Sequence, residues 1–226
     1  MNYTKDIIES VVTAMKSSGT IDAITEVTDV WTIETSDTGN LKDDFKIKIG
    51  SYYYRVSSLV EDTSFVVETT RDLSEETTWE MYFNFGFGGK EEIINDQTLK
   101  GSNSKEAEKF DLIWLFDNIS SSYPDEKKSY ERTDSIEMAL VTDSLKSKTS
   151  EWRLTNRFKT RLNPIFELFR AKLIASDYIV TTGNKLGFDS QDWYNYKDPQ
   201  NVMNQNCDAI EFQVSINIKK EIITNC

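Results

Sequence analysis

The clearest pattern lies near the end of the chain, where apolar and polar residues alternate from Asp208 to Lys219. Successive side chains of a β-strand point to opposite faces, so this segment predicts a strand with one buried face and one wet face. Such strands belong to antiparallel sheets that are open to water on one side. The apolar residues expected on the buried face are Ile210, Phe212, Val214, Ile216 and Ile218.

The first third of the chain predicts one helix followed by a β-rich block. The stretch "TKDIIESVVTAMKSSG" places its apolar residues on one stripe, with Thr4 as the expected N-cap and Gly19 beyond the helix end. Residues 20–72 contain apolar runs separated by short polar turns, which predict three or four strands. These runs are "ITEVTDVWTIET", "FKIKIG", "YYYRVSSLVE" and "SFVVETT".

The remainder predicts further strands and one long helix. "KFDLIWLFDNIS" is continuously apolar, as expected of a strand buried on both faces, and "DSIEMALVTDS" alternates. Apolar residues recur at helical spacing over 151–176, where Pro164 predicts either a kink or the start of a second helical segment. Residues 177–206 are expected to be mostly loop with one short strand. We therefore expect an α+β fold, mostly antiparallel sheet with a long helix packed on it, forming one compact body over residues 1–226.

Composition limits the chemistry that this fold could carry. The chain has 226 residues and no histidine, which excludes His-based triads, proton shuttles and the common zinc sites. Cys207 and Cys226 lack the spacing of a metal-binding pair and indicate a reducing compartment rather than a disulfide framework. We expect no catalytic residue, no metal and no cofactor. No run of about 18 apolar residues occurs, so no membrane-spanning segment is expected.

Two local motifs suggest chemistry but have simpler explanations. "GFGG" at Gly86–Gly89 resembles a phosphate-binding loop, yet it lacks the Lys-Ser/Thr pair that would come next, so a turn is expected. The acidic pairs Asp43–Asp44, Glu75–Glu76 and Glu91–Glu92 could serve acid–base or metal chemistry. We expect these neighbouring carboxylates to be solvated surface charges.

Three regularly spaced arginines predict an anionic partner. Arg153, Arg157 and Arg161 recur at every fourth position of the long helix, in a chain whose net charge is −12 and whose residues 61–150 carry 20 acids against 10 bases. The three arginines could form a solvated face with local ion pairs, contact carboxylates of a neighbouring subunit, or touch DNA. The subunit-interface interpretation places them against the acidic middle segment of the next subunit. The overall charge argues against binding nucleic acid through its phosphates.

The order of segments in the second half of the chain resembles that of neck and tail-terminator (tail-completion) ring proteins of tailed bacteriophages. "KFDLIWLFDNIS" is similar to a strand of these proteins. The next strand and the long helix with "NPIFELF", and the closing "NCDAIEFQVSINIK", resemble their later elements, and "YFNFGFGGKEEI" resembles their strand–Gly–helix lead-in. The tail-terminator-like core would span residues 105–226. The β-rich block at 20–72 is not part of this resemblance. Short-tailed phages, including the crAss-like group, have several stacked neck rings, and the resemblance extends to a ring protein of such a phage.

The resemblance implies a non-enzymatic virion structural protein. It would be a subunit of a sixfold or twelvefold homo-oligomeric ring at the head–tail connector, assembled in the host cytoplasm and contacting portal, neck or tail proteins. DNA would pass nearby without specific binding, and no membrane would be involved. The alternatives are another tail or baseplate component with a host-interaction role, and an enzyme that uses carboxylates and tyrosines.

Overall fold

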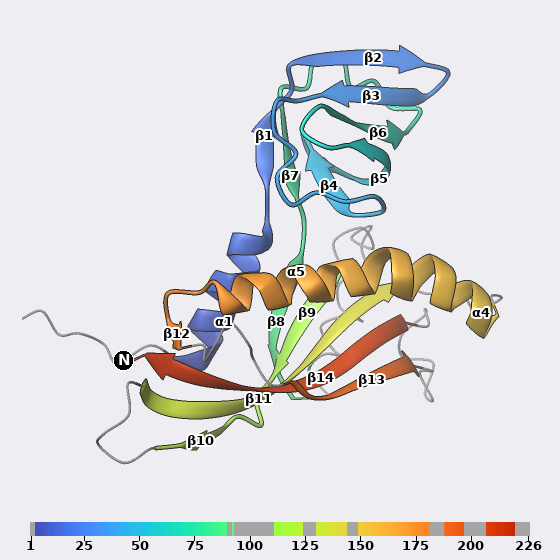
Figure 1. Cartoon of the computed structure of the whole chain (residues 1–226). Helices are drawn as coiled ribbons and strands as arrows, with labels where there is room; N and C mark the ends of the chain where they lie inside the picture. Colours follow the sequence, from blue (N-terminus) through green and yellow to red (C-terminus); the bar gives the residue numbers. More distant parts are fainter. Residues whose placement is uncertain are drawn as a thin grey trace, which may run out of the picture.

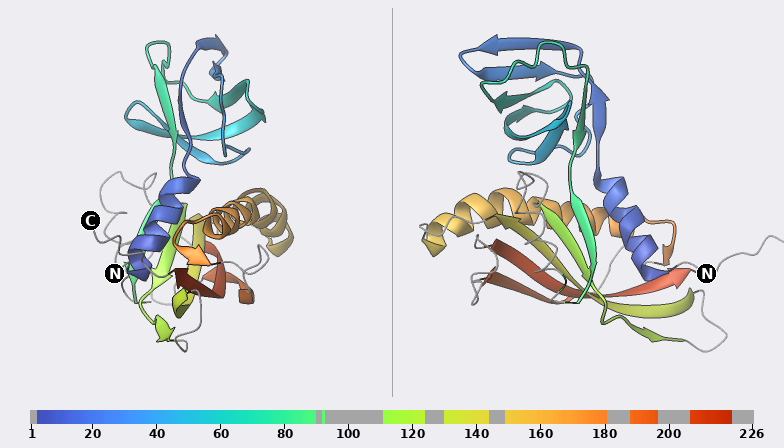
Figure 2. Two further views of the ribbon diagram at one scale, coloured as in Figure 1. Left: turned by 60° about the vertical axis from the view of Figure 1, so that its left-hand side comes forward. Right: turned by 180° about the vertical axis from the view of Figure 1, so that it is seen from behind.

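The structure is a computed structural model that describes residues 3–89, 92, 111–123, 130–143, 149–180, 188–196 and 207–219. A β-rich lobe stands on an α+β lobe, and the chain crosses between them twice (Figures 1 and 2). The predicted α+β class with mostly antiparallel strands is confirmed. None of the helices in these described ranges is long and apolar enough to cross a membrane.

The β-rich lobe is a small barrel that is inserted between the first helix and the first strand of the α+β lobe. Its strands are β1 (Ser18–Thr20), β2 (Ala23–Val27), β3 (Val30–Glu34), β4 (Lys46–Ile49), β5 (Tyr52–Val60), β6 (Ser64–Glu68) and β7 (Thr78–Met81). They pair in the order β1-β7-β4-β5-β6-β3-β2, always antiparallel. The sheet curls round on itself (Figure 1), and we call this lobe the barrel below.

The α+β lobe consists of a twisted sheet with helices on one face (Figure 1). Its helices are α1 (Thr4–Met15), α4 (Ser150–Arg153), the π-helix η1 (Leu154–Leu162) and α5 (Asn163–Ile174). Its strands are β8 (Asn84–Gly88), β9 (Leu112–Phe116), β10 (Ser120–Ser122), β11 (Tyr130–Asp143), β12 (Ile179–Val180), β13 (Phe188–Tyr196) and β14 (Cys207–Lys219). The sheet order is β12-β14-β11-β9-β8; β10 also pairs with β11 and β13 with β14, and only the β8–β9 pair is parallel among these strands.

The closing strand packs as its pattern predicts. The apolar residues of β14 are buried, whereas Gln213 and Lys219 on the other face are exposed. The ring of Phe212 lies 5.0 Å from that of Phe166 and 5.8 Å from that of Phe169, so the long helix covers this face of the sheet. Trp114 on β9 is also buried, with its indole N–H donating to the carbonyl of Gly88 at 3.0 Å.

Several predicted elements differ in the structure. The run at residues 24–35 is a hairpin and not one strand, because Thr28 and Asp29 both adopt positive φ and turn the chain between β2 and β3. The turn predicted at "GFGG" is wrong, because Gly86 and Gly88 belong to β8. Glycine is needed at position 86, since an alanine Cβ there would lie 2.2 Å from the Trp114 ring. Residues 188–196, expected as loop, form β13 on the edge of β14.

The two predicted helices also differ in detail. Tyr3 is the N-cap of α1, and the Thr4 hydroxyl instead donates to the buried carboxylate of Asp134. The long helix runs through Pro164, which lies at the beginning of α5, after the π-helical turns of η1. Proline has no backbone N–H to donate to the carbonyl one turn earlier. It is therefore tolerated at the start of a helical segment, where one segment follows another. The helix of the strand–Gly–helix lead-in, which would follow Gly89, lies almost wholly outside the described residues.

Candidate functional site

The most elaborate polar cluster of the described residues lies between the two lobes, and we call it the interlobe network. The barrel contributes residues from the end of its long loop and from β4 and β5, while the α+β lobe contributes residues from the start of β9, the end of β11 and the π-helix. Its members are Asp44, Lys46, Arg55, Asp111, Thr142, Asp143, Arg157 and Arg161.

Arg161 is the centre of the network and is only 2% exposed. Its Nε and Nη2 donate to the two carboxylate oxygens of Asp44 at 2.9 and 2.8 Å, a two-pronged contact that reaches across the lobes. Its Nη1 donates to the Thr142 hydroxyl at 2.9 Å and to Asp143 Oδ1 at 2.6 Å. A guanidinium suits this place because its planar donors match carboxylate geometry while it remains charged in a buried position.

Arg55 makes the reciprocal contact from the barrel to the α+β lobe. Its Nη1 donates to Asp111 Oδ2 at 3.2 Å, and its Nη2 donates to Asp143 Oδ1 at 3.1 Å. Its Nη1 also donates to the Asp44 carbonyl at 2.9 Å, which fixes the loop that carries the Asp44 carboxylate. The barrel therefore presents Asp44 and Arg55 to the α+β lobe, which presents Arg161 and two acids, Asp111 and Asp143, in return.

Arg157 completes the network from the next turn of the π-helix. Its Nε donates to the Asp143 carbonyl at 3.1 Å, its Nη2 donates to the Asp143 carboxylate at 3.3 Å, and its guanidinium lies 5.0 Å from the Trp152 ring. Thr149 is the N-cap of the helix that presents it, and its hydroxyl accepts from the Trp152 amide at 3.2 Å. Arg157 therefore anchors the end of β11 to the helix within one lobe.

The electrostatics of the network follow from burial and pairing. Burial alone would raise the pKa of Asp111, but Arg55, Arg161 and Lys46 lower it to about 2. The pKa of Asp143 is likewise lowered, since three arginines outweigh the effect of burial. Burial lowers the pKa of Lys46 to about 8, against the opposing pull of Asp111. The two carboxylates are thus held ionised, and their charge is neutralised by pairing.

The subunit-interface prediction for the arginines needs correction for two of the three residues. Arg161 is buried and Arg157 has a 13% exposed side chain, and both pair with carboxylates of their own chain. Their guanidinium groups are therefore committed within the subunit. Arg153 is half-buried and makes no ion pair with the described residues, so its interface role stays a prediction.

The partner of Arg161 is not apparent in the sequence. Asp43 and Asp44 are both expected to be solvated; Asp43 is exposed, but Asp44 pairs with Arg161, 117 positions further along the chain. Asp44 also adopts a φ of 65°, in the left-handed region that few residues other than glycine occupy. The regular spacing of the arginines in the sequence correctly predicts that they have an anionic partner, but it does not identify that partner.

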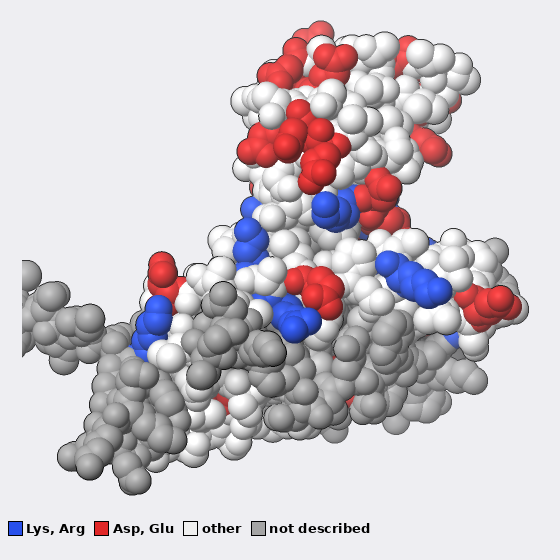
Figure 3. All heavy atoms as spheres, in the orientation of Figure 1, with Lys and Arg blue, Asp and Glu red and all other residues white. Residues whose placement is uncertain are grey.

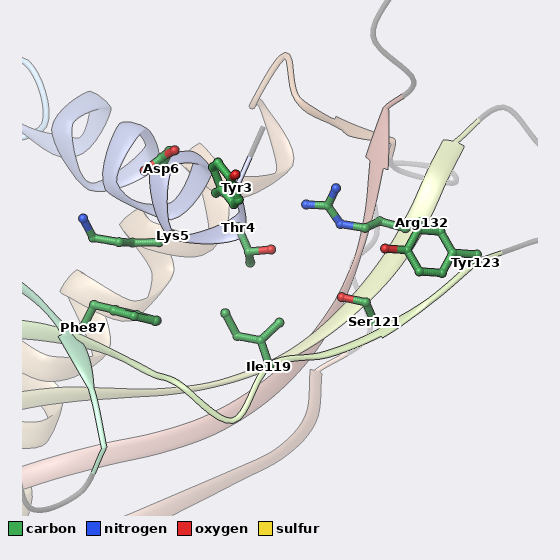
Figure 4. A pocket seen from close by; sticks show the side chains of 9 residues that line it. All are labelled: Tyr3, Thr4, Lys5, Asp6, Phe87, Ile119, Ser121, Tyr123 and Arg132. Carbon is green, nitrogen blue, oxygen red and sulfur yellow. The ribbon is translucent and has the colours of Figure 1, made fainter. Parts of the chain in front are cut away.

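A second feature is an open pocket of about 420 Å³ at the beginning of α1 (Figure 4). Its lining includes Phe87 and Ile119 as well as two polar residues that share a partner. Arg132 Nε donates to the carboxylate of Asp134 at 3.0 and 3.1 Å, and the Ser121 hydroxyl donates to the same group at 2.7 Å. Its rim is aromatic, with Tyr3 69% and Tyr123 67% exposed. Exposed aromatic side chains are enriched where proteins contact other proteins.

The barrel carries an excess of acidic side chains. On the face shown in Figure 3 they form several patches on the barrel, while both basic and acidic side chains lie at the junction and on the lobe below. Residues 18–81 carry 14 acids and 5 bases. This excess makes the barrel surface repulsive to polyanions.

Within the described residues, no group of three or more Asp, Glu or Cys side chains is arranged to hold a metal ion. The carboxylates of the interlobe network face guanidinium groups and a hydroxyl, which suits a mechanical connection. No protein-family model matches the chain, and no curated protein matches its sequence.

Proposed function

We propose that the chain is a non-enzymatic virion structural protein, a subunit of a neck ring that joins the phage head and portal to the tail along the DNA channel. The carrying observation is the two-lobed body itself, in which a long helix covers one face of a mostly antiparallel sheet and a barrel is held at a defined place by buried ion pairs. The resemblance of the second half of the chain to tail-terminator and neck proteins supports the same proposal.

The charge of the barrel supports a position beside the DNA path. DNA is a dense polyanion, so a wall with 14 acids and 5 bases repels it and lets it slide without specific binding. Ring subunits meet head-to-tail through two different surfaces of each copy. Arg153 and the aromatic rim of the pocket near α1 are surfaces that suit such contacts.

The proposal is tested by the assembly state of the purified protein. Native mass spectrometry and negative-stain electron microscopy are expected to show closed rings of six or twelve copies, on the chain alone or after addition of its portal. Arg153→Glu should weaken the ring without changing the circular dichroism spectrum, whereas Lys159→Glu, the same charge reversal at an exposed position of the same helix, should leave it intact. A chain that stays monomeric under both conditions contradicts the proposal.

A second candidate is a tail or baseplate component with a host-interaction role. It is favoured by the barrel standing off the α+β lobe and by the tip of the β2–β3 hairpin, where Val27 is 67% and Val30 39% exposed. Exposed aliphatic side chains at a projecting tip suit a recognition surface. Binding of the isolated virion protein to host cells, lost in Val27→Ser with Val30→Ser, would favour this candidate.

A further inference from the structure

Among the described residues, the two lobes also meet outside the interlobe network, around the two chain crossings. The two chain crossings lie side by side, since the Met81 amide donates to the Ser17 carbonyl at 2.7 Å. An apolar contact lies next to them, where the Phe45 ring meets the Phe83 ring edge-on with centroids 5.8 Å apart. The Asn40 side-chain amide also donates to the Met15 carbonyl at 3.2 Å, beside the same crossing. These contacts restrain the barrel near the line of the two crossings.

Beside the ion pairs the lobes separate. An open cleft of about 600 Å³ lies between the barrel loop that ends at Phe45 and the helix surface formed by Thr160, Pro164 and Leu168. Asp43 and Phe45 line this cleft on either side of Asp44 in the chain. The lobes thus touch at the network and diverge beyond it, so there is space into which the barrel could turn.

The loop that carries Asp44 is held in an unfavourable conformation. Asp44 has a φ of 65°, and non-glycine residues in this region store conformational energy that the surroundings must offset. The offsetting contacts are the two-pronged bond to Arg161 and the donation of the Asp44 amide to the Val56 carbonyl at 2.8 Å. Loss of the bond to Arg161 would remove the contact that directs this side chain toward the other lobe.

We propose that the interlobe network is a releasable latch that sets the orientation of the barrel, with the two adjacent chain crossings as its hinge. The exchanged charges make the latch specific for one orientation, because a displaced barrel breaks the Asp44–Arg161 and Arg55–Asp111 contacts together. The latch is also accessible, since the side chains of Asp44 and Asp143 are 27% and 34% exposed. A cationic side chain of a partner can therefore compete for these carboxylates and free the barrel to turn.

The test compares the orientations of the lobes in solution by backbone residual dipolar couplings of the full chain. One alignment tensor fitted to the α+β lobe should also fit the barrel in the unmodified protein, because the latch makes them one rigid body. In Asp44→Asn with Arg55→Gln, the couplings of the barrel should shrink relative to those of the α+β lobe, while the amide spectrum of each lobe keeps its dispersion. Asp43→Asn is the matched control, since it removes the neighbouring exposed carboxylate and should behave as the unmodified protein.

Two results would overturn the proposal. One is a barrel in the double variant that still shares the tensor of the α+β lobe, which would show that the hinge and the Phe45–Phe83 contact fix the orientation alone. The other is an unmodified protein whose lobes already need separate tensors. Asp44→Asn alone changes one partly exposed oxygen to an amide, so it provides the same comparison if the double variant does not fold.

Discussion

Replacement of Arg161 by glutamine is the most informative single change for the stability of this fold. Arg161→Gln removes the charge that pairs with Asp44 and Asp143 and the donor to the Thr142 hydroxyl. The carboxylate of Asp44 loses its guanidinium partner, whereas that of Asp143 keeps Arg55 and Arg157. Removing one partner of a buried ion pair costs about 3–5 kcal/mol, and because both carboxylates are partly exposed we expect a cost at the lower end, about 3 kcal/mol.

The expected loss is large enough to measure by two independent methods. In a chain of this length about 1 kcal/mol lowers the melting temperature by about 2–4 °C, so a loss of about 3 kcal/mol should lower it by about 6–12 °C. Urea unfolding followed by circular dichroism should give the corresponding fall in the free energy of unfolding. Lys159→Gln is the matched control, because this exposed lysine on the same helix should change stability by no more than about 0.5 kcal/mol.

A double-mutant cycle with Asp44→Asn assigns part of that loss to the interlobe contact. The two substitutions together should cost less than the sum of the separate costs, because each removes the same hydrogen-bonded pair. If the free energy of unfolding of Arg161→Gln differs by less than about 0.5 kcal/mol from that of the unmodified protein, the arginine behaves as a solvated surface charge and does not hold the lobes together.

Three further predictions test packing and pH dependence. Gly86→Ala should destabilise the protein by about 1–3 kcal/mol because its Cβ would meet the Trp114 ring at 2.2 Å, whereas Gly89→Ala, with no neighbour nearer than 3.8 Å, should be close to neutral in thermal melts. Phe212→Ala should cost about 3–5 kcal/mol in urea unfolding because the ring is buried against the long helix; an unchanged midpoint would show that the helix does not cover β14. The folded pKa of Asp111, about 2, lies below its unfolded value, so its stabilising contribution is present above pH ~4 and is lost as the pH falls toward 2. Asp111→Asn should therefore show a smaller loss of stability over this range, and equal losses would contradict the pairing of Asp111 with the arginines.

The sequence predicts well those elements in which the burial of each residue follows from its position in the local pattern. Alternation places Phe212 on the buried face of β14, and the continuous apolar run places Trp114 in a buried strand, because side-chain direction in a strand is a local property. Residues 188–196 contain four aromatic residues but do not alternate cleanly, and they form a strand by pairing with β14. Likewise the hairpin turn at Thr28 and Asp29 lacks the glycine or asparagine that usually marks positive φ.

The candidate site illustrates why pairings between distant residues are harder to predict. The helical spacing of Arg157 and Arg161 correctly indicates an anionic partner, but which carboxylate lies opposite depends on how the barrel docks on the other lobe. Asp44 has no local feature that distinguishes it from Asp43. The glycines of β8 are misassigned for a related reason, since the demand for a residue without Cβ at Gly86 comes from Trp114, 28 positions away.

Localisation of the chain in assembled particles tests the proposed neck-ring role most directly. Virions of a phage that encodes this chain would be labelled with a gold-conjugated antibody against the exposed barrel and imaged by electron microscopy. The neck-ring proposal predicts gold at the junction of head and tail. Gold at the distal tail or baseplate, or particles that lack the chain altogether, would contradict it.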